Sequence, residues 1–113
     1  MARRILIVDD NAMVRVAMQR LMQAYGFEVS VAATVAEALT LLDRLDVVVL
    51  DDEMPDGKCT EVLEKIRNQQ GTARVALWTD STAYTSPSRS GPRPDAIFRK
   101  MELDALLFWI GKS

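Results

Sequence analysis

Short apolar runs alternate along the chain with longer segments in which apolar residues recur every three or four positions. Such runs are typical of buried strands, and the recurring positions are typical of one face of a helix. Strands that alternate with helices predict a parallel sheet covered by helices on both faces. The predicted strands are Ile5–Val8, Phe27–Ala32, Val47–Leu50, Val75–Trp78 and Ala96–Arg99.

Four segments carry the helical pattern. The first follows Asn11, a good helix cap, and ends before Gly26. The second follows Thr34, with Glu37 three residues later in a capping-box pattern. The residues predicted to form the buried helix faces are Val14, Ala17, Met18, Leu21, Met22 and Tyr25; Val35, Ala38, Leu39, Leu42 and Leu45; Cys59, Val62, Leu63 and Ile66; and Leu103, Leu106, Leu107 and Ile110.

The stretch 80–94 breaks this alternation. It reads DSTAYTSPSRSGPRP, contains three prolines and has no apolar face. Because proline blocks a regular helix, the helix expected between the fourth and fifth strands is predicted to be degraded or missing. We therefore expect this stretch to be mobile and the flank of the sheet near Trp78 to be uncovered.

Composition narrows the class of protein. A chain of 113 residues suits one domain, 1–113, and a net charge of −2 gives no support to nucleic-acid binding. The single cysteine fits a reducing cytosol, so we expect a cytoplasmic protein. The absence of histidine excludes histidine-based acid–base catalysis and His-ligated zinc. No stretch approaches the ~20 apolar residues of a membrane span.

Carboxylates follow two of the predicted strands. Asp9 and Asp10 come directly after the first strand, and Asp51 follows the third, with Glu53 two residues later. Parallel strands end at a common edge, where open α/β sheets hold their ligands. Clustered carboxylates repel one another and resist ionisation, which a divalent cation relieves. Oxygen ligands with open coordination positions favour Mg²⁺.

Two further polar residues end strands at the same edge. Thr79 ends the fourth strand, and Lys100 follows the fifth. They would add a hydroxyl group and an ammonium group beside the acids. A carboxylate nucleophile with a metal, a hydroxyl and an ammonium group predicts a phosphoryl-transfer site. There the cations absorb charge on the phosphoryl oxygens while the carboxylate attacks phosphorus.

The paired acids, the D-x-x-M-P string at Asp51, and the placement of Thr79 and Lys100 resemble the response-regulator receiver domain. The resemblance covers essentially the whole chain. It implies a flavodoxin-like, three-layer α/β fold with a five-stranded parallel sheet in the order 2-1-3-4-5. It also implies a bacterial two-component or phosphorelay signalling protein, which catalyses only its own phosphoryl transfer and dephosphorylation.

The resemblance assigns roles to individual acids. Asp51 would be the phosphoacceptor and a ligand of Mg²⁺, and Asp10 a direct ligand. Asp9 would bind the ion mainly through water, and the backbone carbonyl of Glu53 would complete the protein ligands.

The resemblance also implies partners. Thr79 and Lys100 would contact the phosphoryl group, which would come from a phosphohistidine on a histidine kinase or a histidine phosphotransfer protein. A stand-alone receiver would then act by contact with a downstream protein target. Met13 and Val16 lie on the first helix, where the family commonly docks its kinase partner.

Several residues depart from the family pattern and leave other functions open. Asp80 replaces a tiny residue, Ile97 replaces an aromatic one, and Met101 replaces the proline after the lysine. Asp80, Ile97 and the lost helix favour a pseudo-receiver, an interaction module that does not use phosphate, whereas the full set of acids disfavours it. A third hypothesis is a small phosphatase of the haloacid dehalogenase type. That family usually has an aspartate two residues after its nucleophile, where this chain has Glu53.

Two aromatic residues, Phe108 and Trp109, lie off the apolar face of the last predicted helix. Exposed aromatics would suggest a homodimer or partner contact. Equally, one of them could pack beneath the irregular stretch before the fifth strand.

Overall fold

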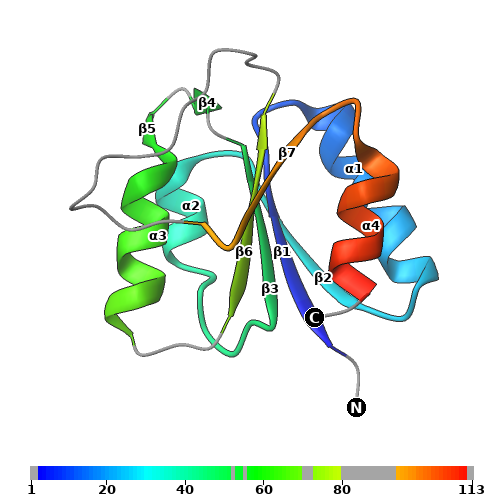
Figure 1. The fold of residues 1–113 in the computed structure, drawn as a ribbon. Coiled ribbons are helices and arrows are strands. Elements are labelled where there is room, and N and C mark those ends of the chain that lie inside the picture. Colours follow the sequence, from blue (N-terminus) through cyan, green and yellow to red (C-terminus); the bar gives the residue numbers. More distant parts are fainter. Residues whose placement is uncertain (1–2, 52, 55, 70–72, 80–93, 112–113) are drawn as a thin grey trace.

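The centre of the molecule is a five-stranded parallel sheet in the order β2-β1-β3-β6-β7 (Figure 1). This computed structural model describes residues 3–51, 53–54, 56–69, 73–79 and 94–111. Counted along the chain without the small hairpin β4–β5, the order is 2-1-3-4-5, as predicted. The strands of the sheet are β1 (Arg4–Val8), β2 (Glu28–Ala32), β3 (Val47–Asp51), β6 (Arg74–Thr79) and β7 (Ala96–Arg99).

Helices cover both faces of the sheet and make three layers. Helices α2 and α3 lie on one face, and α1 and α4 lie on the other (Figure 1). Their bounds are α1 (Ala12–Ala24), α2 (Val35–Leu39), α3 (Cys59–Asn68) and α4 (Leu103–Gly111). The predicted fold class is confirmed for the residues that the structure describes.

The central strands are apolar throughout because each face of the sheet packs on a separate core. In β3, Val48 and Leu50 belong to the core beneath α2 and α3. Val47 and Val49 belong to the core beneath α1 and α4. All four side chains are at most 1% exposed. Two-sided burial explains why β3 reads as a continuous apolar run.

The predicted helix caps are confirmed. The side chain of Asn11 accepts hydrogen bonds from the N–H groups of Met13 and Val14 at the start of α1. Gly26, with φ of 91°, follows the end of α1 in the left-handed region that favours glycine. At α2, Thr34 Oγ1 accepts from the Glu37 N–H at 3.0 Å.

The prediction of a helix reaching Leu45 is wrong, because α2 ends at Leu39. The hydroxyl of Thr40 donates to the Glu37 carbonyl at 2.7 Å, and Arg44 takes a positive φ of 58°. Leu42 is nevertheless buried. The apolar spacing therefore identified residues of the core but not the backbone that carries them.

Two predictions about exposure are also wrong. Ala17 is exposed, and Tyr25, the residue that caps the end of α1, is 64% exposed rather than buried. Trp78 is buried in the core beneath α1 and α4, and its indole N–H donates to the Arg99 carbonyl at 3.1 Å. The uncovered flank near Trp78 stays a prediction. Residues 80–93 lie outside the described residues, so the degraded helix and the mobility of that stretch stay predictions. The side chain of Cys59 also lies outside them.

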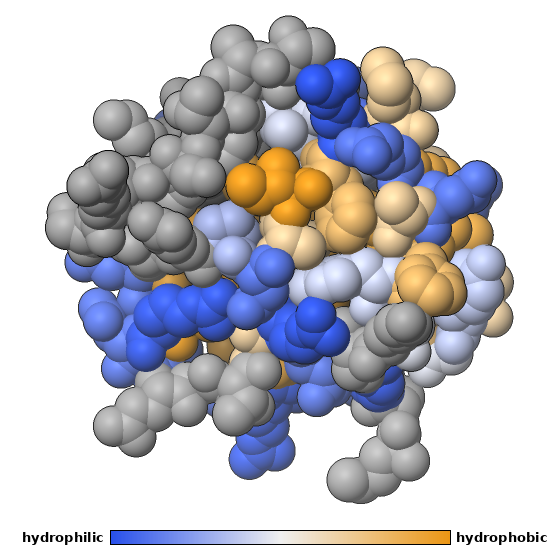
Figure 2. Space-filling view, viewed as in Figure 1, coloured by the Kyte–Doolittle hydropathy of each residue, from blue (hydrophilic) through white to orange (hydrophobic). Residues whose placement is uncertain are grey.

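The two aromatics of the last helix behave differently. Trp109 is partly buried, packs edge-on against Phe98 with ring centroids 6.0 Å apart, and has Arg74 4.5 Å from its ring centroid. Phe108 is 66% exposed. Apolar side chains gather over β7 and α4 on the face shown in Figure 2. No helix in the described part of the chain is long and apolar enough to span a membrane.

Candidate functional site

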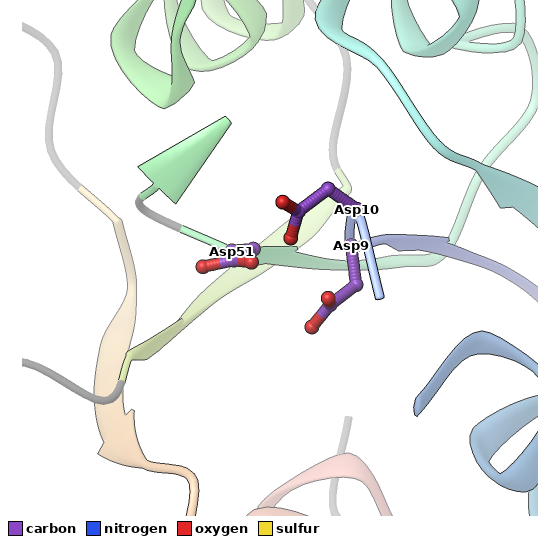
Figure 3. Close-up of side chains that lie close together, drawn as sticks. All are labelled: Asp9, Asp10 and Asp51. Atoms are coloured by element: carbon purple, nitrogen blue, oxygen red, sulfur yellow. The ribbon is translucent and has the colours of Figure 1, made fainter. Parts of the chain in front are cut away.

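Three carboxylates meet at the carboxyl edge of the sheet. Asp9 and Asp10 follow β1, and Asp51 is the last residue of β3. Because β1 and β3 are paired neighbours, their ends lie together. One oxygen from each of the three side chains lies within 4.8 Å of the others, and the carboxylates face a common space (Figure 3). The sequence-predicted cluster of acids is thus assembled.

Asp9 is the most enclosed of the three acids, with 1% of its surface exposed. One carboxylate oxygen accepts the Asn11 N–H at 2.9 Å, and the other accepts from Lys100 Nζ at 2.8 Å. Arg15 donates to the Asp9 carbonyl oxygen at 2.8 Å. These bonds hold the turn between β1 and α1 in place.

Lys100 reaches the acids from the edge strand β7, which lies two strands away from β3 in the sheet. It follows β7, and its backbone N–H donates to the Thr79 carbonyl at 2.9 Å, which extends the pairing of β7 with β6. From there Nζ lies 2.8 Å from Asp9 Oδ2 and 3.3 Å from Asp51 Oδ2. The ammonium group therefore bridges the ends of β1 and β3.

Two effects act on the pKa of Lys100 in opposite directions. Burial of the ammonium group lowers it, but the hydrogen bond to Asp9 and the charges of Asp51 and Asp9 raise it. The net pKa lies above the usual value of 10.5. The lysine therefore carries its charge throughout the neutral range.

This shift predicts a loss of stability at alkaline pH. A raised folded-state pKa means that the stabilisation is complete below the unfolded value of 10.5 and is lost as pH rises through the folded value. Urea unfolding of the wild type and of Lys100→Met should show this loss only in the wild type. Equal alkaline losses in the two proteins would show that another group, such as a tyrosine, is responsible.

Of the remaining predicted site residues, the structure describes Thr79 fully and Glu53 only in its backbone. Thr79 ends β6 and is 1% exposed, at the same edge of the sheet. Glu53 begins the short strand β4 (Glu53–Met54), which pairs with β5 (Gly57–Lys58) in an antiparallel hairpin. The side chain of Glu53 and all of Asp80 lie outside the described residues.

The donors suit a magnesium ion. Asp9, Asp10 and Asp51 offer only oxygen atoms, which are the ligands that Mg²⁺ prefers. Beside the single ammonium group of Lys100, the three carboxyl groups leave a formal excess of negative charge that a divalent cation would neutralise. Asp10 is exposed, which leaves room for water in the coordination shell.

The sequence also matches a known family. A family model described as the response regulator receiver domain matches residues 5–89, most of the chain. The chain belongs to the response regulator receiver family. The receiver domain is in general a signalling module of two-component systems, and the predicted haloacid dehalogenase alternative finds no support.

Relatives of this receiver domain include larger proteins. It is 41% identical over 108 residues to the response regulator MprA of Mycolicibacterium vanbaalenii, covering 92% of this chain and 47% of that protein. It is 37% identical over 112 residues to the CAI-1 autoinducer sensor kinase/phosphatase CqsS of Vibrio cholerae, covering 93% of this chain and 16% of that protein. The chain thus spans less than half of the length of these relatives.

Solved structures agree with the fold. A CheY-like response regulator receiver domain from Methanospirillum hungatei superposes with a TM-score of 0.83 and 28% identity, covering 99% of this chain and 93% of that one. The response regulator TrrA of Thermotoga maritima, solved in complex with Mg²⁺-BeF, gives a TM-score of 0.82 and 31% identity, covering 97% of each chain.

Sequence reasoning missed two residues of this receiver domain. Arg15, which holds the Asp9 carbonyl, appears in the sequence only as a polar position on α1. Asp56 appears only as part of a turn, yet its carboxylate contacts the backbone of α2. Neither contact leaves a pattern in the sequence, because each joins two structural elements that only the fold brings together.

Proposed function

We propose that this receiver domain accepts a phosphoryl group on Asp51 from the phosphohistidine of a histidine kinase or histidine phosphotransfer protein. The single observation that carries the proposal is the convergence of Asp9, Asp10, Asp51 and Lys100 at one sheet edge. Family membership supports it, since the receiver domain is the phosphate-accepting module of two-component signalling. A pseudo-receiver would not need the complete set of charged groups.

The reaction uses the Asp51 carboxylate as the nucleophile. One oxygen attacks phosphorus, the phosphorus–oxygen bond forms, and the bond between phosphorus and the histidine nitrogen breaks. The imidazole leaves with the electron pair of the broken bond. The ammonium group of Lys100, already 3.3 Å from Asp51, is positioned to balance charge on the phosphoryl oxygens, and the Thr79 hydroxyl would donate to one of them.

A bound Mg²⁺ would be a second cation, in addition to Lys100, that balances charge on the phosphoryl oxygens. Direct carboxylate ligands in this proposal are Asp10 and Asp51, with Asp9 acting mainly through water. Asp9 fits the indirect role because both of its carboxylate oxygens already accept hydrogen bonds. The backbone carbonyl of Glu53 is the remaining protein ligand in the proposal.

Partners would be recognised by exposed apolar side chains. On α1, Met13 is 82% exposed and Val16 is 47% exposed, and both suit a kinase or phosphotransfer partner. On α4, Phe108 suits a downstream protein target or a second copy of the chain. We place this exchange in the cytoplasm and assign no nucleic acid to the domain.

The test uses beryllofluoride, a phosphoryl mimic, together with Mg²⁺. A Trp109→Phe variant leaves Trp78 as the remaining tryptophan, and the Trp78 ring centroid lies 5.8 Å from Lys100 Nζ. We expect the fluorescence of Trp78 and the amide signals of residues near Asp51 to change when Mg²⁺ and beryllofluoride are added together. No change in either signal would favour the pseudo-receiver.

A further inference from the structure

The hairpin β4–β5 begins two residues after Asp51 and carries Asp56 between its two short strands. The carboxylate of Asp56 reaches a distant part of the chain. Its Oδ1 accepts the Val35 N–H at 2.8 Å, and its Oδ2 accepts the Ala36 N–H at 3.1 Å. These are the first two N–H groups of α2. Two hydrogen bonds therefore connect the hairpin beside the acid cluster to the start of α2.

Side chains accept hydrogen bonds from the first three N–H groups of α2. The N–H groups in the first turn of a helix have no backbone partner within the helix itself. In α2, Asp56 accepts those of Val35 and Ala36, and Thr34 Oγ1 accepts that of Glu37. The Ala38 N–H then makes the first regular helical hydrogen bond, to the Thr34 carbonyl. Asp56 thus performs a task that the residues of α2 and its own cap cannot complete.

A second contact fastens the same hairpin. Met54, in β4, packs against the core that includes Val35 and Ala38 of α2. An isolated two-stranded hairpin is marginally stable in water, and each of these strands has only two residues. The hairpin therefore depends on Met54 and Asp56 for a fixed position next to Asp51.

We infer that Asp56 is a positioning residue for the metal site. Its hydrogen bonds to the start of α2 fix the position of β4, so that the Glu53 backbone can face the acids. This inference rests on the proposed function. Asp56 lies three residues after Glu53 and is not itself a ligand. Hydrogen bonds from the Val35 and Ala36 N–H groups lower the pKa of Asp56, so its carboxylate still accepts both of them at neutral pH. Outer residues of this kind tune metal affinity by orienting the ligands.

The experiment compares three variants of the full chain in Mg²⁺ titrations. Asp56→Ala removes both hydrogen bonds to α2, and Asp56→Asn keeps an acceptor oxygen without the charge. Thr34→Ala is the matched control, because it removes the Thr34 hydroxyl from the same helix end without touching the hairpin. Binding is followed by Trp78 fluorescence in the Trp109→Phe background, and urea unfolding measures the stability of each variant.

We expect Asp56→Ala to weaken Mg²⁺ binding about 10-fold or more. Asp56→Asn should weaken it less, and Thr34→Ala should bind as the wild type does. In the wild type, Mg²⁺ should also shift the amide signals of Val35 and Ala36, and Asp56→Asn should reduce that shift. Because this variant keeps one acceptor, it tests the inference even if Asp56→Ala does not fold.

Three results would overturn the inference. A wild-type Mg²⁺ affinity in Asp56→Ala would show that the hairpin does not need its hydrogen bonds to α2. If the alanine variant does not fold, a wild-type Mg²⁺ affinity in Asp56→Asn would show the same. Equal weakening by Thr34→Ala would show that only the stability of α2 matters. If the wild type itself binds no Mg²⁺, both the proposed function and the inference fail. If the wild type binds Mg²⁺ and the Asp56 variants bind it equally well, only the inference fails.

Discussion

Replacing Asp51 with asparagine is expected to abolish phosphoryl transfer to this chain. The amide has the shape of the carboxylate but lacks its nucleophilic oxygen anion. The wild type, incubated with Mg²⁺ and phosphoramidate, should gain the mass of one phosphoryl group. Because an acyl phosphate reacts with hydroxylamine, treatment should leave a hydroxamate on the peptide that contains Asp51. The asparagine variant should show neither change.

The folded state should survive this substitution. Asp51 is 4% exposed and lies among two other carboxylates, so removal of its charge relieves repulsion while the loss of one contact with Lys100 opposes it. Asp43→Asn, in the exposed turn after α2, is the matched control and should be phosphorylated like the wild type. Phosphorylation of Asp51→Asn at wild-type yield would contradict the assignment of the acceptor.

Replacing Lys100 with methionine should produce the largest loss of stability among substitutions at the site. Methionine preserves much of the apolar stem but leaves Asp9, 1% exposed, without its ammonium partner at 2.8 Å. Removing one member of a buried ion pair typically costs about 3 kcal/mol or more, because the other charge stays buried. Urea unfolding at pH 7 should therefore show a drop of about 3 kcal/mol in the free energy of unfolding.

Two comparisons identify the cause of that drop. Adding Asp9→Asn to Lys100→Met should recover part of the stability, because the uncompensated charge is then gone. Mg²⁺ should stabilise Lys100→Met more than the wild type, since the cation finds a more negative site. Arg20→Met, on the exposed side of α1, controls for the loss of one positive charge. A change within about 0.5 kcal/mol for Lys100→Met would contradict the buried ion pair.

Features of the sequence that depend on local geometry predicted the structure well. Strand β7 has the predicted bounds, and the caps at Asn11 and Thr34 form the predicted hydrogen bonds. These features are readable because a cap or a short apolar strand involves neighbours in the chain. The end of α2 was not readable, since Leu42 and Leu45 keep a helical spacing while the backbone at Arg44 departs from a helix.

The grouping of the acids was predicted by topology rather than by any local signal. Alternating strands and helices predict a parallel sheet, and a parallel sheet brings Asp9, Asp10 and Asp51 to one edge. The hydrogen bonds around them were beyond this reasoning. Asp56 binds backbone N–H groups 21 and 20 residues earlier in the chain, and no side-chain pattern marks such a partner.

The sequence by itself determined the order of strands and helices, the two-sided apolar strands and the identity of the charged residues that gather at the carboxyl edge. Only the tertiary structure decided which atoms meet there: Lys100 with Asp9 and Asp51, Arg15 with the Asp9 carbonyl, and Asp56 with the start of α2. The physical reason is that periodicity records which side chains leave water. A hydrogen bond between distant segments depends instead on how the packed elements place individual atoms.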